Sequence, residues 1–273
     1  MIIANNLAVE YPAAAGRRRV LSHLSLTLAE GEFVALMGAN GSGKTSLARC
    51  LNGIVSPSAG EVLVDGLDTR DPHDLREIRR RVGLVFQHPD NQMVAPTVER
   101  ELAFGLENLG LPRPEMQRRV AAMLELFELT RYRERAPHQL SGGEKQRVAL
   151  ASVMAMQPRH LIFDEPTSLL DYPARLGFFN TLARLRRPEA GGTPLAILHI
   201  TQFAEEALFA DRLLILHRGE IVLAGVPGEL LARVEELAAF GLRAPVEFRA
   251  FDHLRQNGHA PLALAEMMLS PIL

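Results

Sequence analysis

Two glycine-containing segments, far apart in the chain, hold residues that suit the binding of phosphate. The first reads Gly38-Ala39-Asn40-Gly41-Ser42-Gly43-Lys44-Thr45 and fits the phosphate-loop pattern in full. Glycines let successive backbone N–H groups face phosphate oxygens, and the N-terminus of the following helix adds partial positive charge. Lys44 places a point charge near the terminal phosphates, and the hydroxyl of Thr45 can bind Mg²⁺. With ATP and Mg²⁺ as the cofactors, the nucleotide-binding residues expected here are Gly38, Asn40, Gly41, Ser42, Gly43, Lys44, Thr45 and Ser46.

The second segment reads Leu140-Ser141-Gly142-Gly143-Glu144-Lys145-Gln146. Ser141 and Glu144 form a capping box at the start of a predicted helix. A cap alone does not explain Gly142 and Gly143, since each glycine in a helix costs ~1 kcal/mol relative to alanine. Two bare amides beside a serine hydroxyl at a positive helix end form an anion site. Because the phosphate loop already serves its own nucleotide, we expect this site to bind the nucleotide of a second subunit.

An apolar strand pattern, Leu161-Ile162-Phe163, ends in two acids, Asp164 and Glu165. Asp164 can hold Mg²⁺ through water, and Glu165 can polarise an attacking water molecule as a general base. An acidic loop after a core strand is an equally ordinary interpretation of these two residues alone. The phosphate loop elsewhere in the chain favours the catalytic interpretation.

The elements that must position these residues alternate between apolar strands and helical patterns. Continuous apolar runs suit strands buried on both faces, and they occur at 33–37, 82–86, 161–163 and 195–200. Since helical patterns follow the runs at 33–37, 161–163 and 195–200, we expect a parallel sheet built from βαβ units. Further strands are predicted at 2–10, 20–28 and 61–65, a hairpin at 212–223, helices with Gly/Pro breaks at 97–135, and a long helix at 141–156.

The predicted fold class is therefore α/β: a P-loop NTPase with a mixed or parallel core sheet, an antiparallel β subdomain, an α-helical subdomain and a small C-terminal extension. The expected domains are 1–225, with the helical subdomain at about 90–157, and the extension at 226–273. Arg17, Arg18 and Arg19 are expected to lie in a solvated turn between the first two strands.

Composition narrows the functional class. The chain has 273 residues and a formal net charge of −2, so no overall basic field favours nucleic acid, and we expect no nucleic-acid partner. The one cysteine, Cys50, excludes an internal disulfide and fits a reducing compartment; its apolar helical surroundings indicate packing. The N-terminus lacks a signal-peptide pattern, and no segment has the ~18 apolar residues of a membrane span, which favours a cytoplasmic location.

The order of these motifs resembles that of ABC-transporter ATPases over roughly residues 1–225. The resemblance implies two subunits paired head to tail, each ATP lying between one phosphate loop and the other subunit's Ser141–Glu144 signature. It also implies that Gln87 contacts Mg²⁺ and the attacking water, and that Tyr11 stacks on adenine. Asp171 matches the loop that crosses the dimer interface. Leu169 stands where that family usually has a small residue.

A finer resemblance, to the energy-coupling-factor branch that drives uptake of vitamins and of cobalt or nickel, rests on residues 86–94 and 101–110. It implies that the segment after Gln87 forms a groove for a transmembrane coupling subunit, which works with a substrate-binding membrane subunit. The expected location is then the cytoplasmic face of the membrane, peripherally bound. The tail, around 243–266, resembles a C-terminal extension that contributes to pairing with a second ATPase subunit, in a homodimer or a heterodimer.

One position departs from the family pattern. Gln202 stands where the resemblance implies a switch histidine, while His199 lies upstream within a predicted strand, where we expect it to be packed or hydrogen-bonded. A glutamine amide can still donate a hydrogen bond to the γ-phosphate, but it cannot carry a proton. We therefore expect Gln202 to take part in ATP hydrolysis, with a lower turnover rate than a histidine at this position would give.

Two alternatives to a transport ATPase remain open from the sequence. A non-transport ATPase of the same architecture would act in translation or DNA maintenance, but the single cassette and the lack of sustained heptads do not favour it. A regulatory ATP-binding subunit with slow hydrolysis is suggested by Gln202, whereas the intact Lys44, Asp164 and Glu165 favour catalysis.

Overall fold

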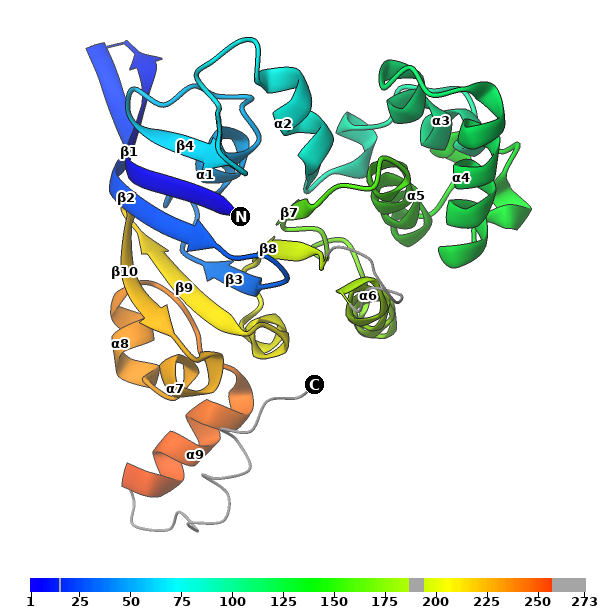
Figure 1. Cartoon of the computed structure of the whole chain (residues 1–273). Helices are drawn as coiled ribbons and strands as arrows, with labels where there is room; N and C mark the ends of the chain where they lie inside the picture. Colours follow the sequence, from blue (N-terminus) through cyan, green and yellow to red (C-terminus); the bar gives the residue numbers. More distant parts are fainter. Residues whose placement is uncertain (15, 187–193, 257–273) are drawn as a thin grey trace.

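The computed structural model describes residues 1–14, 16–186 and 194–256. Two sheets and the helices that pack on and beside them make up these parts of the chain (Figure 1). The expected extension at 226–273, and the resemblance around 243–266, therefore lie partly outside the described residues.

The central sheet has six strands, and five of them run parallel. Its order is β10 (Glu220–Gly225), β9 (Arg212–His217), β3 (Phe33–Met37), β8 (Ala196–Ile200), β7 (His160–Asp164) and β6 (Val82–Val85). β10 closes one edge as the antiparallel partner of β9, so the hairpin predicted around Arg218-Gly219 is confirmed. Every residue of β3, β7 and β8 is buried, because other layers cover both faces of the sheet.

One face of the central sheet packs against a second, antiparallel sheet and a helix. The second sheet has the order β2 (Gly16–Leu28), β1 (Ile2–Ala13), β4 (Ala59–Val64) and β5 (Leu67–Asp68), and α1 (Lys44–Leu51) lies beside it. Val34 and Leu36 of β3 point into this layer, together with Cys50 of α1. Since strand side chains alternate, their neighbours Phe33 and Ala35 point to the opposite layer. Cys50 is fully buried, as predicted.

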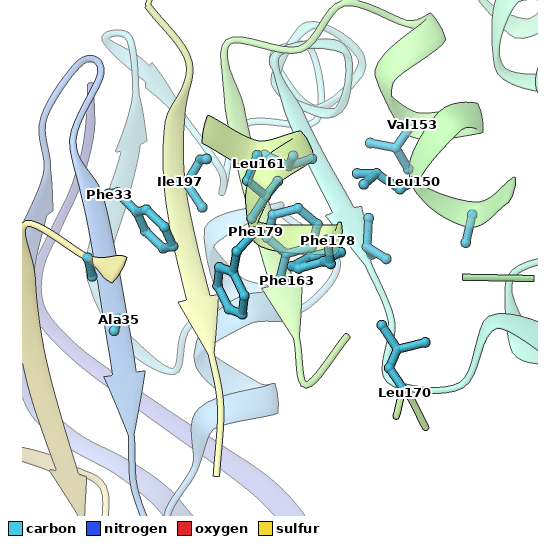
Figure 2. Packing of buried hydrophobic residues seen from close by; sticks show 14 of the residues in the cluster. Phe33, Ala35, Leu150, Val153, Leu161, Phe163, Leu170, Phe178, Phe179 and Ile197 are labelled. Atoms are coloured by element: carbon cyan, nitrogen blue, oxygen red, sulfur yellow. The ribbon is translucent and has the colours of Figure 1, made fainter. Parts of the chain in front are cut away.

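The opposite face is covered by α6 (Tyr172–Arg186), beyond which lies a helical group made of α3 (Val98–Asn108), α4 (Arg113–Leu126) and α5 (Gly142–Ala155). Figure 2 shows Phe178 and Phe179 of α6 lying against Phe163 of β7. The rings of Phe163 and Phe178 meet edge to face with centroids 5.2 Å apart. This packing fixes β7, and with it the acids at the carboxyl end of the strand.

The remaining elements are short. Helix α2 (Leu75–Arg81) precedes β6, and α7 (Pro227–Leu231), α8 (Val234–Ala239) and α9 (Val246–Gln256) follow β10. Single 3₁₀ turns form η1 (Pro89–Asn91), η2 (Thr130–Tyr132) and η3 (Pro137–Gln139), and η4 (Ala204–Phe209) is a longer 3₁₀ segment. The helical pattern expected after β8 is thus a 3₁₀ segment.

The turn expected for Arg17, Arg18 and Arg19 was wrong, although all three residues are exposed to solvent as expected. These residues belong to β2, which pairs with β1 as far as Gly16 opposite Ala13. Because side chains alternate along a strand, Arg18 points to one face of the hairpin and Arg17 and Arg19 point to the other.

Candidate functional site

The phosphate loop joins β3 to α1 and needs its glycines for different reasons. Gly43, at the N-cap of α1, has φ 112°, and Gly41 has φ 78°; both lie in the left-handed region that favours glycine. At Gly38 a Cβ would lie 2.4 Å from the carbonyl oxygen of Leu216. At Gly41 a Cβ would meet nothing within 4 Å, so the loop is open on that side. The backbone can therefore be approached closely by a ligand such as a phosphate chain.

Lys44 is a buried cation at the base of this loop. Its Nζ donates to the carbonyl oxygens of Gly38 at 2.8 Å and Ala39 at 3.2 Å, and lies 3.6 Å from Oε1 of Glu165. Burial lowers the pKa of Lys44, and the nearby charges of Glu165 and Asp164 partly oppose that shift. An anion bound beside Nζ would favour the charged form further.

Asp164 ends β7 next to Thr45. Burial raises the pKa of Asp164, and a hydrogen bond with the Thr45 side chain acts in the opposite direction. Thr45, Asp164 and Gln87 line one cavity of about 310 Å³. Within the described part of the chain no three His, Cys, Asp or Glu residues gather as a ligand group. A cation here would take hydroxyl, amide, water and phosphate oxygens, which is the donor set that suits Mg²⁺.

Glu165 is the residue on which the other side chains converge. Its Oε2 accepts from Nε2 of Gln87 at 3.0 Å, and both carboxylate oxygens accept from Nε2 of Gln202 at 2.8 Å. The Gln202 amide also donates to Oδ1 of Asn40 at 3.0 Å. The backbone of Glu165 has φ 54°, a strained conformation for a non-glycine residue, and its N–H donates to the carbonyl oxygen of Ile200. The carboxylate is thereby held in front of the phosphate loop.

These residues border a single cavity of about 480 Å³. It is lined by Arg18, Val20, Asn40, Gly41, Gly43, Lys44, Thr45, Ser46, Gln87, Glu165 and Gln202. Tyr11 lies at its edge, where the phenol donates to Oγ of Ser46 at 3.2 Å. The lining brings together residues predicted from four separate segments: the phosphate loop, Gln87, Glu165 and Gln202. Arg18 and Val20 were not among the predicted site residues, because the register of the β1–β2 hairpin decides which side chains of β2 face the cavity.

The second glycine-rich segment starts α5, and its predicted capping box is confirmed. Oγ of Ser141 accepts from the Glu144 N–H, and Oε2 of Glu144 accepts from the Ser141 N–H at 2.8 Å. The hydroxyl of Tyr132 also donates to Glu144, and these hydrogen bonds, that of Tyr132 first, lower the pKa of Glu144 to about 2. Glu144 is thus fully engaged within its own chain.

Gly142 and Gly143 are not required by the fold of this chain. Neither has a positive φ, and a Cβ added to either would meet one atom at ordinary contact distance, the Leu169 oxygen at 3.9 Å and Leu170 Cδ2 at 3.5 Å. The segment from Ser141 to Glu144 does not line the cavity around Lys44. Figure 1 shows α5 in the helical group, apart from α1 and the phosphate loop. The bare amides therefore lie outside the lining of their own chain's nucleotide cavity.

The loop after Glu165 contributes Asp171, Leu169 and Tyr172. Oδ1 of Asp171 accepts from the Ala174 N–H at 3.0 Å at the start of α6. Leu169 is 53% exposed and Tyr172 is 70% exposed. This loop therefore presents apolar surface beside the segment that carries Gly142.

His199 is packed and hydrogen-bonded within β8, as predicted. It is fully buried, and its Nε2 lies 2.9 Å from Oε2 of Glu206, which also accepts from the Thr201 hydroxyl. Aromatic rings surround it, including Phe163 and Phe179. His199 cannot reach the cavity that Gln202 lines.

A phosphate loop, a strand-end acid pair and a separate glycine-rich helix start, carried on a parallel sheet, define a P-loop ATPase cassette. The chain belongs to the family of ABC transporter ATP-binding proteins, because the family model described as ABC transporter matches residues 21–168. The chain binds ATP, and it is an ATPase that drives transport.

Relatives place the chain in the energy-coupling-factor and cobalt-import branch of that family. It is 47% identical to the energy-coupling factor transporter ATP-binding protein EcfA1 of Symbiobacterium thermophilum over 249 residues, which cover 91% of this chain and 85% of that protein. It is 46% identical to the cobalt import ATP-binding protein CbiO of Syntrophus aciditrophicus, covering 88% and 84%. The family expected from the sequence and the expected enzyme class, an ATPase, are therefore confirmed.

Solved structures agree with the fold. The structure of cbiO1 from Clostridium perfringens, part of the ABC transporter complex cbiONQ, matches with a TM-score of 0.75 and 30% identity, covering 92% of this chain and 98% of that one. The dimeric, post-hydrolysis structure of the ATP-binding cassette MJ0796 bound to ADP and Pi matches with a TM-score of 0.75 and 29% identity, covering 82% and 98%. The predicted P-loop α/β fold is confirmed. Among the described helices, none combines the length and apolar character that crossing a membrane requires.

Proposed function

We propose that this chain is the ATP-hydrolysing energy-coupling subunit of an importer for a vitamin or for cobalt or nickel ions. The observation that carries the proposal is the convergence of Lys44, Gln87 and Gln202 on Glu165 in one cavity, which Gly142 and Gly143 do not line. One half of an ATP site is complete in the chain, and the other half is free for a partner. The relatives named for cobalt import and energy coupling support the substrate classes.

In this proposal each residue has a separate role in binding or hydrolysing the nucleotide. Lys44 and the loop amides bind the phosphates, and Tyr11 stacks on adenine. Thr45, Gln87 and Asp164 hold Mg²⁺, which would neutralise charge that develops on the phosphates. Glu165 accepts a proton from the attacking water, and Gln202 orients that carboxylate and the γ-phosphate.

The signature segment completes the site of a second ATPase subunit, identical or different. Ser141, Gly142 and Gly143 approach the partner's phosphates, Glu144 holds the start of α5 in place through Ser141 and Tyr132, and Asp171 lies at the subunit boundary. A dimeric relative with bound nucleotide supports this pairing. The described part of the C-terminal extension, which contains α7, α8 and α9, adds contacts between the two ATPases.

The transmembrane coupling subunit docks on a different face, at the inner side of the membrane. A cavity of about 700 Å³ lies between α2, α3 and α5, where Phe104 is 47% exposed and Gln92 and Met156 contribute to the walls. Nζ of Lys145, in the signature segment, lies 2.6 Å from Oδ1 of Asp90, just after Gln87. Movement of a coupling helix in this groove would therefore reach both the signature and Gln87. A separate membrane subunit binds the substrate.

The test is purification of the native chain from membranes, followed by identification of the proteins that accompany it. The proposal expects a second ATPase or a second copy, together with membrane subunits. Recovery only with ribosomes or DNA would support the non-transport alternative instead. The regulatory alternative would be supported by a different result. In that case the chain would co-purify with a transporter and bind ATP, but ATP hydrolysis by the transporter would not depend on Glu165.

A further inference from the structure

The three consecutive arginines of β2 are all exposed, but their side chains lie on two different faces of the hairpin. Arg17 and Arg19 pair with Glu10 across the hairpin, at 3.9 Å and 2.9 Å, on an exposed surface. Their side chains are 72% and 55% exposed. Arg18, between them, points to the other face of the ribbon, because strand side chains alternate.

The face to which Arg18 points is that of the nucleotide cavity. In the register of the hairpin Arg18 stands directly opposite Tyr11, so the two side chains share one face at cross-strand spacing. Tyr11 is held to the phosphate-loop helix through its hydrogen bond to Ser46. Arg18 itself lines the cavity with Lys44 and Thr45.

Among the charged residues that line the cavity, Arg18 has no oppositely charged partner. Lys44 lies within ion-pair distance of Glu165, whereas the described part of the chain offers Arg18 no ion-pair or hydrogen-bond partner. The lining thus has two cations and one carboxylate. An anionic ligand would supply the missing charge, and a guanidinium can donate to it through several N–H groups at once.

We propose that Arg18 is a nucleotide-binding residue that contacts the phosphate chain at its base-proximal end. Lys44 serves the terminal phosphates, whereas Arg18 lies beside Tyr11, where the base would stack. This assignment rests on the proposed nucleotide site and adds a contact made by the antiparallel sheet. Residues of the antiparallel sheet would then contact both the base and the phosphates of the nucleotide.

The experiment measures the affinity of Mg²⁺-ADP, which the protein does not hydrolyse, for the wild-type chain and the variants Arg18→Ala, Arg18→Lys and Arg17→Ala. Arg18→Ala is expected to bind about tenfold or more weakly, as befits loss of a hydrogen bond between charged groups. Its affinity should also depend less on salt concentration than that of the wild type. Arg18→Lys should recover much of the loss, and Arg17→Ala, the matched control on the opposite face, should bind like the wild type.

Two results would overturn the assignment. Arg18→Ala and Arg17→Ala with the same affinity would show that Arg18 is only a surface residue. Equal losses in Arg18→Ala and Arg18→Lys, with unchanged salt dependence, would indicate contact with the base and not with phosphate. Failure of the proposed nucleotide site is distinguishable, because in that case Lys44→Ala would bind ADP as well as the wild type does.

Discussion

The Nε2 amide of Gln202 donates to both carboxylate oxygens of Glu165, each at 2.8 Å. Nε2 of Gln87 lies 3.0 Å from Oε2 of this carboxylate, and Nζ of Lys44 lies 3.6 Å from its Oε1. Donors of the protein itself therefore surround the carboxylate. A neutral amide fixes the position of this carboxylate but cannot relay a proton. The predictions that follow test what each part of this arrangement contributes.

Replacing Gln202 with histidine should raise the ATPase rate of the assembled complex. Histidine can hydrogen-bond at the same place and can also carry a proton, a function that typically contributes ~10²–10⁴-fold. That range is an upper bound here, because Glu165 remains in place. Steady-state phosphate release measures the effect, with Gln256→His on exposed α9 as the control. No increase over wild type would contradict the assigned role of Gln202.

Replacing Glu165 with glutamine should reduce hydrolysis by ~10²–10⁴-fold and leave ATP binding intact. Glutamine preserves the shape of the side chain but cannot accept a proton from water. Single-turnover hydrolysis and ATP affinity should be measured on the same preparation. Glu205→Gln, an exposed neighbour of the Gln202 loop, serves as control. Unaltered hydrolysis in Glu165→Gln would mean that another group is the general base.

Replacing Glu206 with alanine should destabilise the fold by ~1–3 kcal/mol, because it leaves the buried His199 ring and Thr201 hydroxyl without their acceptor. Chemical denaturation measures the change in the free energy of unfolding. The exposed Glu205→Ala should change it by less than ~0.5 kcal/mol. A loss in Glu206→Ala as small as that of the control would show that the buried pair does not stabilise this protein.

The same carboxylate predicts a pH dependence. Burial acts to raise the pKa of Glu206, but the hydrogen bonds and charge of His199, together with Thr201 and Thr167, outweigh it and hold the pKa below its ordinary value of 4.5. The stabilisation is therefore present above pH 4.5 and lost as the pH falls through the lowered pKa. Unfolding measured across that range should show a smaller acid loss in Glu206→Gln than in wild type. Parallel pH profiles would contradict the linkage.

Cys50 should be inert in the folded protein. Burial raises the pKa of its thiol to about 12, and the side chain is fully buried. Near neutral pH a thiol reagent should label no cysteine in the native protein and one per chain in denaturant. Rapid native labelling would mean that the layer between α1 and the central sheet opens readily.

Local patterns predicted the parts of this structure that depend on neighbours in sequence. The apolar run Phe33–Met37 is a strand, Ser141 and Glu144 form the capping box, and His199 is packed in its strand. Each follows from periodicity or from residues within one helical turn. The short, highly charged helix α2 offered no apolar period and was not predicted.

What could not be predicted depends on long-range register. Gln87 and Gln202 meet Glu165 from positions 78 and 37 residues away in the chain, so their convergence needs the sheet order. Arg18 was misread because the length of the β1–β2 hairpin decides which of three arginines faces the nucleotide cavity. A shift of one residue in that register would have turned Arg17 or Arg19 inward instead.

The central claim is that Ser141, Gly142 and Gly143 serve a nucleotide held by another subunit. The measurement is native mass spectrometry of Glu165→Gln and of Glu165→Gln with Ser141→Arg, each with ATP and with the ATPase that co-purifies with the chain. We predict that Glu165→Gln forms an ATP-retaining pair of subunits, and that the added Ser141→Arg abolishes the pair while each free subunit still binds ATP. Pairs that form equally well with Ser141→Arg, or ATP binding lost from the free subunit, would contradict the claim.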